Sequence, residues 1–207
     1  MTPGGRPLAF EPDAALDAAV VTFWRHGYEA AGMAELTQAM NISRPALYRA
    51  FGDKAQLFRA ALDRYIALNM GYVEDALEKP TSREVAEAFL TGNAKAVTTP
   101  GRPPGCLSVQ AMVTDEADAF SQLAENRRVI QTRLADRFRR GIQEGDLPSD
   151  EDAEELARFM ITLTTGFAIR ATDGESQDAL LALARRSLAI FSAPNSNSPR
   201  TEGMTHD

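Results

Sequence analysis

The stretch that decides the fold is Asn41–Lys54, which reads NISRPALYRAFGDK. Ser43 can cap a helix whose first turn holds Pro45, where the missing N–H costs no hydrogen bond. Gly52 ends that helix, and Asp53 can cap the next one. The sequence therefore predicts two helices separated by a sharp turn, an arrangement typical of a helix-turn-helix motif.

The residues on either side extend this helical pattern. Towards the N-terminus, a helix is predicted from Pro12 to about Gly27, with apolar residues three and four apart. A short second helix begins at Gly32, with Leu36, Ala39 and Met40 turned inward. Towards the C-terminus, a long fourth helix follows Asp53, and its capping box uses Gln56. Its predicted core face comprises Leu57, Phe58, Ala61, Leu62 and Tyr65.

The rest of the chain is predicted to be helical as well. Thr81 and Glu84 form a capping-box signature before an apolar row, and three prolines place Thr99–Gly105 in a loop. No strand signal is present, so the fold class is all-α with about nine helices. The remaining helices are predicted at 82–98, 106–115, 119–144, 150–171 and 177–191.

Composition excludes several classes of protein. Of 207 residues, 44% are hydrophobic and 25% are charged, as in ordinary globular proteins. One cysteine and two histidines cannot form an internal disulfide or a closed zinc site, so no metal or other cofactor is expected. No apolar run approaches the roughly 18 residues of a membrane span, and no signal peptide is recognisable. The expected compartment is the cytoplasm.

The net charge of −7 is unevenly distributed. Residues 1–68 contain seven Lys/Arg and seven Asp/Glu, whereas residues 69–207 contain 15 and 22. The whole acidic excess therefore lies in the larger C-terminal part. Nucleic acid meets the local field of the neutral N-terminal part, so the global charge does not exclude DNA binding.

The order of these motifs resembles the tetracycline-repressor (TetR) family of bacterial regulators. The resemblance is specific over residues 10–60 and rests on Phe23, Gly27 and Tyr28, on 33–40, on 41–54, and on Leu57 and Phe58. It implies an all-helical homodimer with a helix-turn-helix DNA-binding domain at 1–53. A ligand-binding and dimerisation domain follows at 54–192, and the tail at 193–207 is expected to be disordered.

The third helix is predicted to enter the major groove of double-stranded DNA. Leu47 and Phe51 anchor it, which leaves its other side chains to face the DNA. Arg44 can donate two hydrogen bonds to a guanine, and Pro45 and Ala46 can contact a thymine methyl group. By resemblance, Tyr48 and Lys54 contact phosphate. The full set of predicted DNA-binding residues is Ser43, Arg44, Pro45, Ala46, Tyr48, Arg49 and Lys54.

Two positions depart from the family pattern. The family usually has a hydroxyl residue just before helix two, but this chain has Ala31 and Gly32. A side-chain cap and a phosphate contact are therefore expected to be missing there.

The resemblance also implies an effector cavity among helices four to eight. Its predicted lining is Phe89, Asn93, Cys106, Gln110, Met112, Phe138 and Phe167, although each of these is at least as compatible with plain core packing. Cys106 opens a helix, where a thiol can become reactive. We nevertheless expect Cys106 to be a buried packing residue rather than a sensor.

Dimerisation is predicted from the helix at 150–171, which is apolar on more than one face, and from the last helix. Two copies of each should form a four-helix bundle. The predicted interface residues are Leu156, Met160, Leu163, Phe167, Leu181, Ala184 and Leu188.

The sequence thus predicts a ligand-responsive transcriptional regulator. It should act as a repressor that binds a palindromic operator and is released by an unknown small-molecule effector. Two alternatives remain open, a helical adaptor that binds only protein and an enzyme. The usual nucleotide-binding, serine-hydrolase and zinc-protease motifs are absent, and no catalytic residue is predicted.

Overall fold

Helix-forming residues and clear caps make most of the described chain helical. The computed structural model describes residues 10–110 and 117–191, without the side chains of residues 117–120 and 122. The predicted all-α class is confirmed, with ten α-helices in this part of the chain. They are α1 (Pro12–Ala30), α2 (Met33–Ala39), α3 (Arg44–Phe51), α4 (Lys54–Asn69), α5 (Gly71–Leu77), α6 (Ser82–Val97), α7 (Leu107–Gln110), α8 (Ala117–Glu144), α9 (Ala153–Thr172) and α10 (Gln177–Ser187), followed by the 3-10 helix η1 (Leu188–Phe191).

The predicted helix caps are present. The Ser43 side chain accepts a hydrogen bond from the Ala46 backbone N–H, at 3.3 Å. Complete capping boxes pair Asp53 with Gln56 and Thr81 with Glu84. These bonds satisfy backbone N–H groups that a helix start otherwise leaves free, so they fix where α3, α4 and α6 begin.

The first four helices share one core. Leu36 of α2 and Leu47 of α3 are fully buried, and the ring of Phe23 in α1 packs edge-on against that of Phe58 in α4, with 4.9 Å between centroids. The prediction that Ala39 faces inward is wrong, because that residue is exposed and Met40 takes the inner position. The core of the N-terminal part thus extends past residue 53 into α4.

The predicted fourth helix is present as α4, with its predicted core face buried, and a separate helix that was not predicted, α5, follows it. The chain leaves helical geometry at Met70, where φ is −109° and ψ is 14°, and α5 begins at Gly71. Next to the break, the Asn69 side chain donates to the Tyr65 carbonyl oxygen at 2.8 Å. This side-chain bond competes with the helical backbone bonds at the point where glycine lowers helix propensity.

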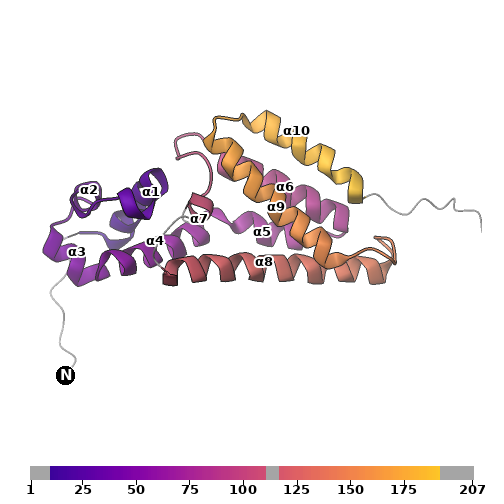
Figure 1. Cartoon of the computed structure of the whole chain (residues 1–207), viewed down its shortest axis with the longest axis horizontal. Helices are drawn as coiled ribbons and strands as arrows, with labels where there is room; N and C mark the ends of the chain where they lie inside the picture. The colour runs from indigo at the N-terminus through magenta and orange to yellow at the C-terminus, as the bar shows by residue number, and fades with distance from the viewer. Residues whose placement is uncertain (1–9, 111–116, 192–207) are drawn as a thin grey trace, which may run out of the picture.

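The larger part of the molecule is a stack of long helices (Figure 1). In this view α8 runs along its lower edge, with α9 crossing above and α10 outermost. α9 packs against both α6 and α8, and α10 packs against α6. Phe138 of α8 and Phe191 of η1 close the far end of the core, with ring centroids 5.3 Å apart.

Gly105 positions α7 at the junction of the two parts. Its φ of +86° is a conformation that favours glycine, and its N–H donates to the Val97 carbonyl oxygen at 2.9 Å. A Cβ atom there would collide with Thr172 Oγ1 and lie 3.0 Å from the Ala168 carbonyl oxygen.

We expect Gly105→Ala to lower the free energy of unfolding by about 2–4 kcal/mol, from backbone strain plus overpacking. Gly145→Ala is the matched control, because Gly145 has a similar φ of +79° but open space around its Cβ position. Urea denaturation of both variants measures the difference. Equal decreases would show that the close approach to Thr172 and Ala168 does not matter.

Candidate nucleic-acid interface and internal cavity

The outer face of α3 carries exposed cationic and aromatic side chains. Leu47 is fully buried and holds the helix on the core, while Phe51 packs against Phe10 with 6.3 Å between ring centroids. Of the predicted DNA-contacting residues on and before this helix, Ser43, Arg44, Pro45, Tyr48 and Arg49 are exposed, and Ala46 is half-buried. No acidic residue lies in the first turn of α3.

Arg44 and Tyr48 lie together on this face. The Arg44 guanidinium donates to the Tyr48 hydroxyl at 3.4 Å and lies 5.8 Å from the ring centroid. Tyr48 is 44% exposed, a high value for an aromatic side chain. The pair therefore presents two hydrogen-bonding groups to solvent from the first two turns of the helix.

Lys54 lies at the start of α4, beside α3. Its Nζ donates to the Glu29 carbonyl oxygen at 3.3 Å and lies 4.5 Å from the centroid of the Tyr28 ring. These contacts hold the ammonium group at the start of α4, beside α3, where its positive charge can attract an anion.

The start of α2 lacks a side-chain cap, as the sequence predicts. Gly32 is the N-cap residue and makes no side-chain bond, and Ala31 is fully buried. The basic face is therefore built by α3 and the first turn of α4, and α2 adds no hydroxyl at its N-cap.

A small cavity of about 50 Å³ is lined by residues of α5, α6, α7, α8 and α9. Three of the predicted effector-binding residues, Phe89, Asn93 and Cys106, line it together. The remaining lining residues are Met70, Tyr72, Ser108, Val109, Arg127, Ile130, Ile161, Thr164 and Thr165.

Cys106 connects this cavity to the N-terminal part. The Tyr65 hydroxyl donates to Cys106 Sγ at 3.2 Å, and Ser108 Oγ lies 2.8 Å from the same sulfur. The Tyr65 ring packs edge-on against Trp24 of α1, with 4.8 Å between centroids. Burial raises the pKa of Tyr65 well above its usual value, so the hydroxyl stays protonated and able to donate.

The other predicted effector-binding residues lie elsewhere. Gln110 lines a separate surface hollow and donates to the Pro104 carbonyl oxygen at 3.4 Å. Phe138 packs against Phe191, and Phe167 is 2% exposed in the core, so neither lines the cavity. Met112 lies outside the described residues.

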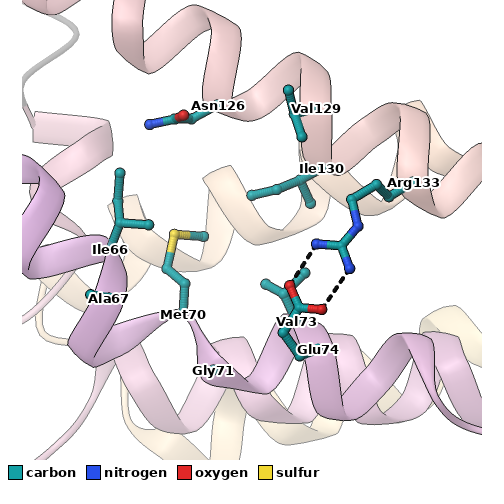
Figure 2. Close-up of a pocket in the computed structure, with 10 residues that line it drawn as sticks. All are labelled: Ile66, Ala67, Met70, Gly71, Val73, Glu74, Asn126, Val129, Ile130 and Arg133. Atoms are coloured by element: carbon teal, nitrogen blue, oxygen red, sulfur yellow. Dashed lines mark hydrogen bonds and ion pairs between the residues drawn. The ribbon is translucent and has the colours of Figure 1, made fainter.

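A wider groove of about 340 Å³ lies outside the cavity, between the α4–α5 junction and α8 (Figure 2). Met70 and Ile130 line both spaces. Glu74 and Arg133 form a two-bond ion pair at one end of the groove, with both N···O distances 2.5 Å. This pair lowers the pKa of the Glu74 carboxyl group.

The predicted dimer residues divide between two faces. Leu156, Met160, Phe167, Ala184 and Leu188 are at most 5% exposed within a single chain. They have almost no surface left for a partner, so these five belong to the inner row and not to the predicted interface. Leu163 and Leu181 are half-buried and lie nearer the surface.

The outer face of α9, α10 and η1 carries other apolar side chains. Ile169, Leu183 and Ile190 are 44–50% exposed. Phe159, four residues before Leu163, is half-buried. The second apolar face of α9 predicted from the sequence is therefore present. It includes Phe159 and Ile169, which the sequence places off the inner row, rather than the buried residues predicted for the interface.

Six polar residues at or beside the cavity were not predicted from the sequence as ligand-binding: Tyr65, Tyr72, Ser108, Arg127, Thr164 and Thr165. A signal for Arg127 existed. It falls on the inner row of α8, four residues after Leu123 and three before Ile130, and has no acidic residue three or four positions away. A charged residue on an apolar row without a helical partner is a candidate binding group.

The described residues show neither a metal site nor a membrane span. No group of three or more His, Cys, Asp or Glu could hold a metal ion there. None of the helices in that part is long and apolar enough to cross a membrane.

Similarity to known proteins covers almost the whole chain. Residues 15–61 match the model of the family "Bacterial regulatory proteins, tetR family", and residues 83–188 match a "Tetracyclin repressor-like, C-terminal domain". The repressor ComR of Escherichia coli K12 is 34% identical over 90% of this chain and 91% of its own. The repressor BdcR of the same strain is 30% identical over 87% and 88%.

Solved structures agree with these matches. The regulator CifR, in a cysteine mutant complexed with 26-bp double-strand operator DNA, is 39% identical, with a TM-score of 0.83. The match covers 90% of this chain and all of that one.

Proposed function

Because the chain belongs to the TetR family of bacterial transcriptional regulators, we propose that it is a repressor that binds a palindromic operator as a homodimer and leaves it when a small molecule occupies the internal cavity. The cytoplasm, where chromosomal DNA is reached, is its proposed compartment. The observation that carries the DNA-binding proposal is the exposed Arg44–Tyr48 pair on a helix anchored by the buried Leu47.

Base reading and phosphate binding are divided between two groups. Arg44 can reach guanine edges from the first turn of α3, as recognition helices do with their N-terminal residues. Lys54 meets the phosphate backbone, where its charge fixes register without reading sequence. Ser43, Pro45, Ala46, Tyr48 and Arg49 complete the proposed contact surface.

The proposed dimer uses the outer face of α9 and α10. Apolar side chains that are about half exposed in one chain would be covered when two copies form a four-helix bundle. The two DNA-binding surfaces then face half-sites about one or more helical turns apart.

The proposed release begins at Cys106. Its hydrogen bond from Tyr65, and the contact of Tyr65 with Trp24 in α1, connect the cavity wall to the DNA-binding part. A ligand that displaces α7 or α8 would move Tyr65 and hence α1, which supports α3 through the shared core.

Fluorescence anisotropy across a salt series tests the DNA-binding proposal. Wild-type protein should prefer the palindrome upstream of its own gene over scrambled DNA, and its affinity should fall steeply with salt. Equal affinity for both duplexes at every salt concentration would contradict the proposal. It would favour a protein-binding adaptor or an enzyme.

Cys106→Ser should leave operator affinity and effector response largely unchanged. Serine can keep the hydrogen bonds to Tyr65 and Ser108, and burial of the hydroxyl should cost about 1 kcal/mol of stability. Anisotropy with and without hydrogen peroxide or an electrophile checks this. Release of the wild-type protein by either reagent, but not of the variant, would instead make the thiol a sensor.

A further inference from the structure

Two residues that line the cavity each have one buried polar atom without a hydrogen-bond partner in the described structure. Asn93 is 6% exposed, and its Nδ2 donates to the Tyr72 hydroxyl at 3.0 Å. Its Oδ1, an acceptor, has no hydrogen-bond partner within the described structure. Arg127 Nη1, a donor, is also buried without a partner there. Buried polar atoms normally have hydrogen-bond partners. An acceptor and a donor without partners, on two residues that line the same cavity, therefore point to a ligand that bonds to both.

Arg127 also carries a charge that the described residues leave unpaired. Burial lowers the pKa of Arg127, which means that the charged form is poorly solvated. The other described arginines on α8 have partners. Arg128 pairs with Glu125, Arg133 with Glu74, Arg139 with Asp136 and Glu154, Arg140 with Glu144, and Arg137 donates to the carbonyls of Lys79 and Pro80. Within the described structure, Arg127 therefore lacks the anionic or carbonyl oxygen that the others have.

We propose that this cavity binds a small carboxylate that also carries a hydroxyl group. The carboxylate would accept hydrogen bonds from Arg127, and the hydroxyl would donate to Asn93 Oδ1. The carbon atoms would contact Phe89, Ile130 and Ile161. This inference rests on the proposed function and specifies the effector class for the same cavity.

The volume of the cavity and the charge of Arg127 further restrict which ligands could bind. About 50 Å³ is room for roughly three to five water-sized groups, so the polar part of the ligand has only a few heavy atoms. A second donor carrying positive charge, such as an amine, would be repelled by Arg127, which disfavours amino acids. We expect the ligand to enter from the groove of Figure 2, because Met70 and Ile130 line both the groove and the cavity.

A set of small molecules tests each half of the proposal on the full chain. Lactate and 3-hydroxybutyrate carry both groups, propionate and butyrate lack the hydroxyl, and lactamide lacks the charge. At saturating concentration and matched ionic strength, at least one hydroxy acid should raise the thermal midpoint by roughly 2–8 °C. The matching acid without the hydroxyl group, propionate for lactate or butyrate for 3-hydroxybutyrate, should give less than half that shift. Lactamide should also give less than half of it. Equal shifts, or none with either hydroxy acid, would overturn the proposal.

Two variants locate the site. Arg127→Met should abolish the preference for lactate over lactamide. It should not lower the thermal midpoint without ligand, because it removes a half-buried charge that has no partner in the described structure. Arg128→Met, on the exposed side of the same helix, should retain the preference. If Arg127→Met responds like wild type, or is strongly destabilised, Arg127 has another role and the proposal fails.

Asn93→Asp provides an independent test by placing a carboxylate inside the cavity. We expect a higher thermal midpoint and loss of the hydroxy-acid response, because the new carboxylate takes the place of the ligand's. An undiminished response would contradict the site.

Operator binding separates this inference from the proposed function. If ligand-free protein selects the operator but no hydroxy acid shifts its melting or releases it, only the ligand class is wrong. If the protein melts as expected with ligand but never selects the operator, the repressor proposal fails and the ligand site stands.

Discussion

Leu163→Arg should convert the protein to a monomer and lower its affinity for a palindromic operator at least a hundredfold. Leu163 lies at the edge of the outer face of α9, near Phe159, and is only half-buried in one chain. An arginine there would place a charge in the proposed four-helix bundle without disturbing the protomer core. A monomer has only one DNA-binding surface. It therefore loses the increase in affinity that two linked surfaces provide, which is about 10²–10⁴.

Leu183→Arg tests the same face from α10, where the native side chain is 46% exposed. Leu68→Arg is the matched control, since Leu68 is 55% exposed on α4 and should tolerate the change. Light scattering at micromolar concentration gives the mass, and anisotropy gives the operator affinity. A monomeric variant with wild-type operator affinity would contradict the dimer model.

Leu188→Arg is not a usable test of this interface. Leu188 is 3% exposed inside the protomer, next to the Phe138–Phe191 pair at the far end of the core. Arginine there should unfold the chain rather than separate two folded protomers.

Arg44→Ala should produce the second large effect. If the guanidinium donates hydrogen bonds to a guanine, its removal costs about 1–3 kcal/mol at each half-site. A dimer that contacts both half-sites should therefore bind the palindrome roughly 30-fold or more weakly. The preference for that base pair should relax as well. Arg44 is exposed, and the only hydrogen bond that its guanidinium makes in the described structure is to Tyr48, so folding stability should change little.

Lys54→Ala should behave differently at the same interface. A phosphate contact carries no sequence information, so binding to the operator and to scrambled DNA should weaken alike. The slope of log affinity against log salt should become shallower by about 0.9 for each phosphate that the variant no longer neutralises, or about twice that for a dimer.

Anisotropy over a salt series, with the operator, a guanine-substituted operator and scrambled DNA, separates the two variants. Arg128→Ala is the control, since it removes one exposed arginine far from α3. If Arg44→Ala and Lys54→Ala are both indistinguishable from wild type, the proposed mode of DNA binding is wrong.

The sequence by itself determined the fold class, the starts of α3, α4 and α6, and which side chains of α3 are exposed. Each helix cap joins two residues that are only three positions apart, so it can be recognised from the sequence. The caps are Ser43 with Ala46, Asp53 with Gln56, and Thr81 with Glu84. The same holds for α3, whose buried Leu47 leaves the basic side chains outward.

Tertiary structure decided which face of α9 is buried and which residues line the cavity. An α-helix with two apolar rows does not specify which row meets its own core; packing on α6 and α8 buried Met160 and left Ile169 half exposed. Asn93 and Arg127 lie on separate helices, so their unpaired atoms come together only when the chain folds. The physical reason is range: caps and helical periodicity act within about four residues, whereas burial and the pairing of polar groups depend on contacts between segments distant in sequence.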